Sequence, residues 1–228
     1  MFPEKILKDK NNIFSGEREI GTKIEEFSAD HINRYNFAKY FINKKDIVLD
    51  AACGVGYGSS MMAEKASRVI GIDYSEEAIK YAKNHWAKRN ILFIQGDLLY
   101  KKTYPEQKFN VIVSFETIEH LKDDKKYLKL IADHLHSKGI LFISSPNSEK
   151  KHAEDNPWHF RHYTPDEFKR LVQPYFKYVS QFTQIYNGIK WGKGGDNNVL
   201  VCSRSPRYRY KILIYLIHKM LYHLKREA

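Results

Sequence analysis

The sequence predicts an α/β fold built around a parallel sheet. Five short apolar runs recur along the chain, at residues 47–50, 70–73, 91–95, 109–115 and 139–145. Such continuous apolar runs are typical of strands that a parallel sheet buries on both faces. A glycine-rich loop follows the first run, and an acidic residue ends or follows each of the first three. In open α/β sheets these features meet at the carboxyl edge, where nucleotides bind.

The glycine-rich loop is the most informative segment. Asp50 ends the first run, and Gly54, Gly56 and Gly58 follow on alternate positions. Glycines allow backbone N–H groups and a helix N-terminus to approach a ligand closely. The spacing differs from the G-x-G-x-x-G of dinucleotide enzymes. An acid beside the glycines suits a ligand with a positive centre, such as S-adenosylmethionine; another nucleotide or a purely structural turn remains the alternative.

The next two runs also end in acids. Asp73 lies 17 residues after Gly56, near the offset of about 20 residues at which a carboxylate accepts from ribose hydroxyls. Ser75 is predicted to cap a helix. Asp97 follows the third run, where it is expected to meet an adenine edge. Any one of these acids alone has a simpler interpretation as a cap or turn residue.

The segments on either side complete the predicted domain. Apolar residues at helical spacing predict a helix over 28–42. Residues 146–163 form a long polar and aromatic loop, a kind that is usually functional or disordered. Thr164, Pro165 and Glu167 predict the start of another helix. Two closing strands are predicted at 177–186 and 197–203, joined by a glycine-rich loop over 187–198.

Composition indicates one domain in a reducing compartment. The chain has 228 residues, 43% of them hydrophobic, which is enough for one sizeable core. Cys53 and Cys202 give no disulfide framework, and Cys53 is interpreted as a small filler under the cofactor rather than a catalytic thiol. Residues 1–22 contain no signal peptide pattern, and no apolar stretch reaches about 18 residues. The expected location is cytoplasmic.

Several motifs together resemble a known family. Over residues 25–203 the chain resembles class I S-adenosylmethionine-dependent methyltransferases, and within them bacterial enzymes of cell-surface glycan or small-molecule methylation. The resemblance implies a Rossmann-like seven-stranded, mostly parallel sheet with an antiparallel C-terminal strand and helices on both faces. The motifs are His31-x-x-Arg34-Tyr35, the loop 53–59, Ser114-Phe-Glu-Thr-Ile-Glu-His-Leu121, Ser145-Pro-Asn147 and residues 156–168.

The resemblance also implies where S-adenosylmethionine binds, leaving S-adenosylhomocysteine as the product. The helix over 28–42 is expected to cover the cofactor, with His31, Arg34 and Tyr35 within reach; simple packing is the alternative for this helix. The predicted cofactor-binding residues are Tyr35, Asp50, Ala52, Gly54, Gly56, Asp73, Tyr74, Gly96, Asp97, Leu98, Phe115 and Glu116.

Chemistry is expected after the fourth strand, where the transferred methyl group should project. His120 is predicted as the base that removes the proton of a hydroxyl acceptor, because its ordinary pKa suits that role, with Glu119 beside it. An amino group that arrives neutral needs no base, so the acceptor atom is either oxygen or nitrogen. A structural Glu–His pair is the alternative.

The loop before residue 164 is predicted to bind the acceptor. Phe160 and Trp158 would supply apolar walls, and Arg161 would hold a phosphate, as in a nucleotide-linked or lipid-linked sugar. An aromatic plug is the alternative. The predicted acceptor-binding residues are Trp158, His159, Arg161, His162 and Tyr163.

No metal is expected in the main interpretation. An alternative set of Glu116, Glu119, His120 and His159 offers carboxylates and imidazoles that suit a divalent ion. That set resembles the metal site of the small-RNA 2′-O-methyltransferase family. The chain lacks an obvious RNA-end-binding region, so this activity stays an alternative.

The predicted division of the chain is an N-terminal extension over 1–24, the methyltransferase domain over 25–203 and a basic amphipathic helix over 204–228. That last segment holds seven Lys/Arg and one acid, a net +6 of the total +11. Leu213, Leu216, Met220 and Leu224 recur at helical spacing, which suits the anionic inner face of a membrane. For this helix, docking on its own domain or on a second subunit of a homodimer is the alternative. For the whole protein, the alternative is a non-catalytic role in binding membrane or, less favoured, nucleic acid.

Overall fold

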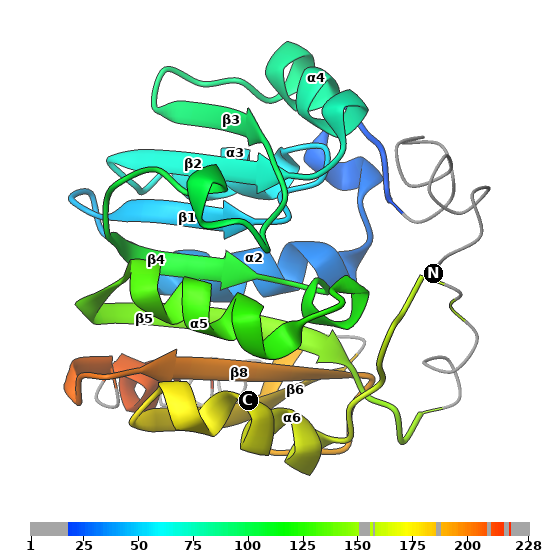
Figure 1. Cartoon of the computed structure of the whole chain (residues 1–228), viewed down its shortest axis with the longest axis vertical. Helices are drawn as coiled ribbons and strands as arrows, with labels where there is room; N and C mark the ends of the chain where they lie inside the picture. Colours follow the sequence, from blue (N-terminus) through cyan, green and yellow to red (C-terminus); the bar gives the residue numbers. More distant parts are fainter. Residues whose placement is uncertain are drawn as a thin grey trace, which may run out of the picture.

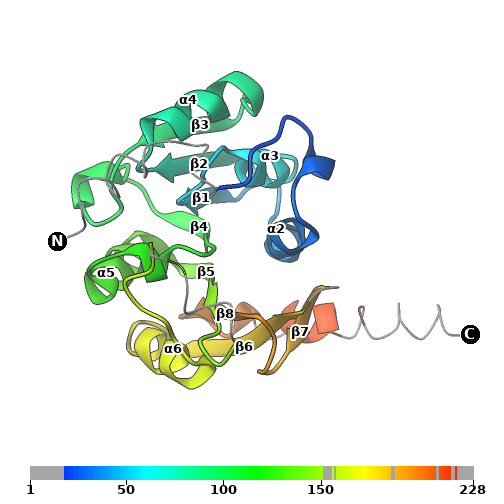
Figure 2. The same cartoon turned by 90° about the vertical axis from the view of Figure 1, so that its right-hand side faces the viewer.

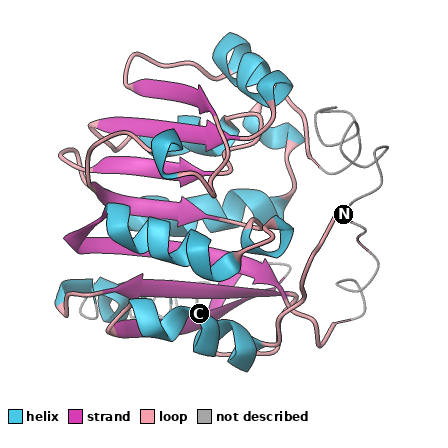
Figure 3. Ribbon diagram, in the orientation of Figure 1, coloured by secondary structure: helices cyan, strands magenta, loops and turns pink. Residues whose placement is uncertain are grey.

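The computed structural model describes residues 18–150, 156, 158–185, 188–208, 211–216 and 219. One mixed sheet with the order β3-β2-β1-β4-β5-β8-β6-β7 forms the middle layer (Figures 1 and 3). Its strands are β1 (Ile47–Ala51), β2 (Arg68–Asp73), β3 (Ile91–Gln95), β4 (Phe109–Ser114), β5 (Leu135–Pro146), β6 (Tyr178–Ile185), β7 (Gly188–Trp191) and β8 (Asn197–Ser203).

The first five strands are parallel, as their apolar runs predict. Val48 and Leu49 of β1 are both fully buried, but they belong to two separate core clusters. Alternate residues of a strand point to opposite faces, so the sheet is covered on both sides. The chain moves outward from β1 to β2 and β3, then returns to place β4 on the other side of β1. This reversal creates a switch point at the carboxyl ends of β1 and β4.

Helices cover both faces of the sheet. Figure 2 shows α2 and α3 on one face and α5 and α6 on the other, and the buried residues of α4 join the cluster of α2 and α3. The helices are α2 (Ala29–Phe41), α3 (Tyr57–Ala63), α4 (Glu76–His85), α5 (Asp124–His134) and α6 (Pro165–Val172), with short 3₁₀ turns η1 (Ile24–Glu26), η2 (Lys101–Thr103), η3 (Ile118–His120) and η4 (Gln173–Tyr175).

The local signals for three helices are confirmed. α2 occupies the predicted segment within one residue at each end. Ser75 accepts a hydrogen bond from the Ala78 N–H at the start of α4. Thr164 and Glu167 form a reciprocal capping box at the start of α6, with Pro165 at its first position. Each cap satisfies backbone N–H groups that the helix itself leaves unpaired.

The predicted strand number is wrong by one. The predicted closing strands are present as β6 and β8, and β8 is antiparallel to its neighbours β5 and β6. The predicted loop between them, however, contains β7, which pairs antiparallel with β6 and makes an eight-stranded sheet. β7 has only four residues. That is too short for alternating apolar and polar residues to reveal a strand within a glycine-rich segment.

The described part of the C-terminal segment docks on the domain itself. Tyr208 and Ile212 are buried in the same cluster as α2 and α3, and the Tyr215 ring lies 4.9 Å from that of Phe37. Leu213, on the predicted apolar face, is 55% exposed. Leu216, on the same predicted face, packs against this cluster, so the face that packs is the predicted one only in part. Residues 209, 210, 217, 218 and 220–228 lie outside the described residues. Among the described residues, no helix combines the length and apolarity that a membrane crossing needs.

Candidate active site

A cavity of about 770 Å³ lies at the carboxyl edge of the sheet, at the switch point. In Figure 1 this edge is on the right, where the parallel strands end. The cavity wall comes from the residues after β1, β2, β3 and β4, from α2, and from the loop over 156–160. Residues far apart in the sequence therefore share one pocket, of a size typical for small-molecule and cofactor sites.

The glycine-rich loop forms part of this wall. Gly54 has a φ of +54°, and the space where a side chain would begin is open. Gly56 has a φ of +93°, in the left-handed region that glycine tolerates best. A Cβ on Gly58 would lie 2.0 Å from the Tyr35 ring. The glycines are thus needed for the turn and for close packing against α2, while Gly54 leaves backbone exposed to the cavity.

Asp50 lies beneath the loop rather than in the cavity wall. Its carboxylate accepts hydrogen bonds from Ser59 Oγ at 2.6 Å and from Tyr35 OH at 3.2 Å. Burial raises the pKa of Asp50 to about 7, although these two hydrogen bonds act in the opposite direction. The residue joins β1, α2 and α3, and it is not among the residues that line the cavity.

The other two strand-end acids line the cavity. Asp73 accepts from the backbone N–H groups of Gly54 and Ser75, both at 2.9 Å, and Arg18 approaches it at 3.5 Å. Asp97 accepts from the Leu99 N–H at 2.8 Å. Of the predicted cofactor residues, Tyr35, Ala52, Gly54, Asp73, Tyr74, Asp97, Leu98, Phe115 and Glu116 line the cavity, whereas Asp50, Gly56 and Gly96 do not.

The α2 wall carries the three residues predicted for it. His31 lies 3.0 Å from Tyr57 OH, and burial lowers its pKa. Arg34 is 3% exposed and donates to Gln184 Oε1 on β6 at 2.6 Å. This contact joins the first helix of the domain to its closing strands and places a guanidinium beside the cavity.

Acidic residues and imidazoles gather after β4. Glu116 has a φ of +48°, and its carboxylate accepts from Ser144 Oγ at 2.6 Å and from Asn197 Nδ2. Glu119 in η3 is 1% exposed, and neither of its carboxylate oxygens has a hydrogen-bond partner in the described part of the chain. Burial, and next the neighbouring Glu116, raise the pKa of Glu119 well above its usual range. His120 Nδ1 lies 3.2 Å from the Trp158 carbonyl oxygen.

The acceptor loop contributes fewer residues than predicted. His159 lines the cavity together with Asn156 and Phe160, and the Phe160 N–H donates to the Glu119 carbonyl oxygen at 2.8 Å. The other predicted acceptor-binding residues do not line the cavity. They are Trp158, Arg161, His162 and Tyr163.

Arg161, which the sequence predicts to hold a phosphate, contacts other parts of the protein in this structure. Its guanidinium donates to the carbonyl oxygens of Leu121 and Lys122 at 2.8 and 2.7 Å and lies 3.4 Å from Asp124. Tyr163 OH also donates to Asp124, at 2.9 Å. Both residues hold the loop against the start of α5.

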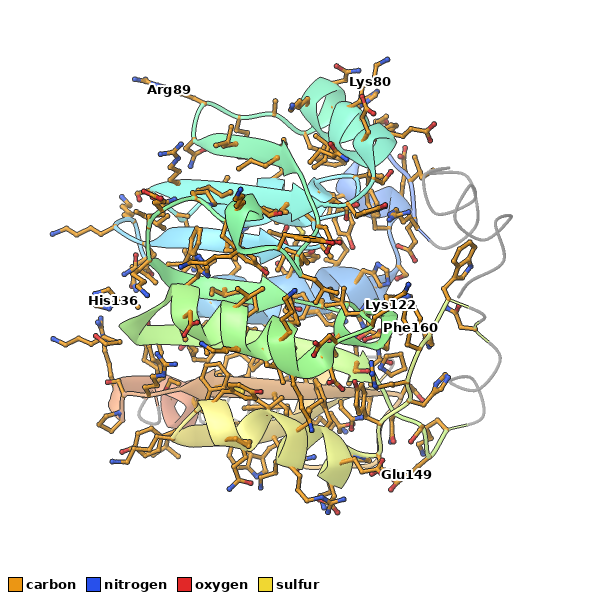
Figure 4. The ribbon with its side chains drawn as sticks, viewed as in Figure 1. Lys80, Arg89, Lys122, His136, Glu149 and Phe160 are labelled. Carbon is orange, nitrogen blue, oxygen red and sulfur yellow. The ribbon has the colours of Figure 1, made fainter. Side chains whose placement is uncertain are left out.

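Three lysines that line the cavity are not predicted from the sequence. They are Lys122, Lys126 and Lys150; Figure 4 shows Lys122 beside Phe160 at the carboxyl edge. Lys122 Nζ lies 5.9 Å from the centre of the Phe160 ring, and Lys126 Nζ 5.3 Å from that of Tyr100. Nothing in their spacing distinguishes them from the many other lysines of this basic chain.

Comparison with known proteins identifies the family. A family model described as a methyltransferase domain matches residues 42–191. The chain belongs to the methyltransferase domain family. The predicted methyltransferase family is thereby confirmed. The narrower glycan subfamily is not shown.

Two curated relatives show how far this similarity extends. The chain is 33% identical over 129 residues to a probable S-adenosylmethionine-dependent methyltransferase of Mycobacterium tuberculosis, covering 55% of this chain and 46% of that protein. It is 38% identical over 109 residues to a ubiquinone biosynthesis O-methyltransferase of Pelagibacter ubique, covering 46% and 43%. The chain thus spans about half the length of these relatives.

The fold agrees with solved methyltransferase structures. A TehB-like S-adenosylmethionine-dependent methyltransferase of Corynebacterium glutamicum superposes with a TM-score of 0.60 at 17% identity, covering 89% of this chain and 97% of that one. At this identity the likeness shows the shared Rossmann-like fold alone.

The residues present fit the cofactor of the family. The cavity volume suits a nucleoside-sized ligand, the space beside Gly54 is open, and Asp73 and Asp97 stand at successive strand ends. Carboxylates at these points can accept from ribose hydroxyls and from an amino group of the base.

Proposed function

We propose that the protein transfers a methyl group from S-adenosylmethionine to a hydroxyl, or amino, group of a small-molecule or glycan acceptor. When bound, S-adenosylmethionine supplies an electrophilic methyl group on a sulfonium. The observation that carries the proposal is that His120 and Glu119 line the same cavity as the glycine-rich loop. One pocket thus holds both a nucleotide-type binding wall and groups that handle protons.

A hydroxyl acceptor is favoured over an amino acceptor. The Trp158 carbonyl can only accept, so its contact with His120 Nδ1 requires that this nitrogen carry the hydrogen. Nε2 is then the basic nitrogen of the neutral ring, the atom that can take the proton of a hydroxyl. The relative from Pelagibacter ubique is named an O-methyltransferase, which supports oxygen as the acceptor atom.

The acceptor is proposed to carry a negative charge. Lys122, Lys126 and Lys150 line the cavity, and no ion pair of these lysines occurs among the described residues. A phosphate-bearing acceptor, such as a nucleotide-linked or lipid-linked sugar, would meet this charge. The lysines thus take the role that the sequence assigned to Arg161.

A direct experiment tests the reaction. The full chain is incubated with methyl-labelled S-adenosylmethionine and fractionated cell material, and the label is expected in a glycolipid, nucleotide-sugar or small-molecule fraction. Cofactor binding is measured separately by thermal shift, where saturation to about 100 times Kd stabilises by about 2.7 kcal/mol. A chain that shows no shift and transfers no label would refute the proposal.

Two variants test the roles of the residues. His120→Ala is expected to reduce turnover with the identified acceptor by about 100-fold or more, while the cofactor shift is retained. The double variant Lys122→Ala/Lys126→Ala is expected to raise the KM for a phosphate-bearing acceptor. Lys80→Ala/Arg89→Ala, which removes the same charge on and just after α4, at the top of the molecule in Figure 4, is its control. Near-normal turnover in His120→Ala would exclude His120 as the base.

A further inference from the structure

We infer that Glu119, His120 and His159 bind a divalent first-row transition-metal ion at the acceptor end of the cavity. Within the described residues, each of the three offers one ligand atom, and these atoms all lie within 4.8 Å of one another. All three residues line the cavity. The inference rests on the proposed function and revises one part of it, because an ion held by His120, rather than His120 acting as a base, would activate the acceptor hydroxyl.

The Glu119 carboxylate is the first reason for this assignment. It is 1% exposed, and among the described residues no group donates to either oxygen with full hydrogen-bond geometry, although the nearby Ser145 hydroxyl acts to lower its pKa. A carboxyl group buried without a partner keeps its proton unless a cation replaces it, and native proteins pair ionised carboxylates or use them to coordinate metals. Because Glu119 also lines the cavity, a cation that enters the cavity can supply the missing partner.

The surroundings of the two imidazoles are the second reason. Metal-binding histidines commonly donate their other ring N–H to a backbone carbonyl, and His120 has this arrangement with the Trp158 carbonyl oxygen. The His120 and His159 rings are 4.7 Å apart at an interplanar angle of 80°. The hydrogen bond from the Phe160 N–H to the Glu119 carbonyl oxygen fixes the loop beside η3, which holds His159 near Glu119.

The donor set favours a transition metal over magnesium or calcium. Imidazole suits zinc, iron, cobalt and nickel, whereas the two hard cations prefer oxygen ligands only. Ligand atoms around one ion at roughly 2.1 Å lie at most about 4.2 Å apart. The ligand atoms of the three residues lie within 4.8 Å of one another, so their side chains need to move closer by only a few tenths of an ångström to share one ion.

The inferred site differs from the one that the sequence offered as an alternative. Glu116 does not belong to it, because among the described residues only Glu119, His120 and His159 bring their ligand atoms within 4.8 Å of one another. Three protein ligands leave coordination positions free for an acceptor oxygen. A hydroxyl bound to the ion would release its proton to water more readily, so no separate base would be needed. Under this inference His120 is a ligand and not the base, while the proposed methyl transfer and its class of acceptor are unchanged.

Metal titration of the intact chain tests the site without relying on turnover. Chelator-treated protein is titrated with Co²⁺, Zn²⁺ and Mg²⁺ by calorimetry, and bound Co²⁺ is followed by its visible absorption. We expect one Co²⁺ or Zn²⁺ ion per chain and much weaker binding of Mg²⁺. Glu119→Gln and His159→Ala are each expected to weaken Co²⁺ binding at least about tenfold. His136→Ala is the control, because His136 is exposed at the opposite edge of the sheet (Figure 4).

Cofactor binding serves as the folding control for these variants. Glu119→Gln and His159→Ala should keep the thermal shift given by S-adenosylmethionine, because neither side chain belongs to the glycine-rich loop. Co²⁺ that fails to bind the wild-type chain at 1 mM, or that binds Glu119→Gln equally well, would overturn the inference. A wild-type chain that binds Co²⁺ but not S-adenosylmethionine would instead refute the proposed methyl transfer, and leave the metal site standing.

Discussion

Asp50 shows how one buried residue can support a binding loop without facing the ligand. Its carboxylate connects the end of β1 to Ser59 on α3 and Tyr35 on α2. The sequence predicts its position at the strand end correctly. It could not reveal that the carboxylate turns inward, because this depends on two partners 9 and 15 residues away.

The raised pKa of Asp50 predicts how stability depends on pH. The folded pKa of about 7 lies above the ordinary 3.8, so between these values the folded protein holds a proton that the unfolded chain has released. The free energy of unfolding should therefore fall as pH rises from about 4 to about 7, by on the order of 4 kcal/mol. Asp50→Asn should remove this contribution, which urea denaturation at several pH values can measure. An unchanged pH dependence in Asp50→Asn would contradict the assignment.

Two glycines of the loop should respond differently to alanine. Gly58→Ala brings its Cβ against the Tyr35 ring, so we expect a loss of at least about 2 kcal/mol in unfolding free energy, as in other overpacked cores. Gly54→Ala meets no atom within 4 Å and should cost only about 1 kcal/mol for its positive φ, while it narrows the space for the cofactor. Urea denaturation and S-adenosylmethionine titration separate the two effects; equal destabilisation would contradict this account.

The loop over 158–163 is the element whose role changed most between sequence and structure. The resemblance places it over the pocket, and the structure confirms that His159 and Phe160 reach the cavity. Sequence alone could not separate cavity residues from fastening residues, because aromatic and basic side chains serve both purposes. Arg161 fastens the loop through backbone carbonyls, which no pattern in the sequence indicates.

Arg161 should therefore act on the acceptor through the position of the loop. Arg161→Lys loses the two-pronged donation to Leu121 and Lys122, so we expect a higher KM for the acceptor, with the Kd for S-adenosylmethionine unchanged. Steady-state kinetics with the identified acceptor and cofactor calorimetry provide the measurements. Lys193→Ala, which removes an exposed cation paired with Asp166, is the control. A cofactor Kd that changes as much as the acceptor KM would argue against this role.

At the scale of the whole molecule, the sequence predicts the sheet better than it predicts what packs around its end. The buried strands and the helix caps are local signals, and they are confirmed. The added strand β7 and the docking of the C-terminal segment depend on contacts between distant parts of the chain. Leu213 and Ile212 are equally apolar, so periodicity alone could not decide which of them faces the core.

This pair offers a matched test of docking. Ile212 is 5% exposed and Leu213 55% exposed. Ile212→Ala should lower the unfolding free energy by about 2–4 kcal/mol, and Leu213→Ala by no more than about 0.5 kcal/mol. Thermal or urea denaturation gives both values. Equal effects would show that the segment does not pack on the domain as described. Comparing the vesicle binding of the wild-type and Leu213→Ala proteins then tests the predicted membrane contact.

The short strand β7 has a consequence for association between chains. It is the last strand of the sheet, and an open border of this kind invites pairing with another polypeptide. Lys219 donates to the Ile189 carbonyl oxygen of β7, so an ammonium group from the basic tail occupies a position where a foreign strand would otherwise bind. Lysines at an open strand are one of the ways in which proteins discourage such pairing, so a protein truncated after residue 208 is expected to self-associate more readily, which light scattering can measure.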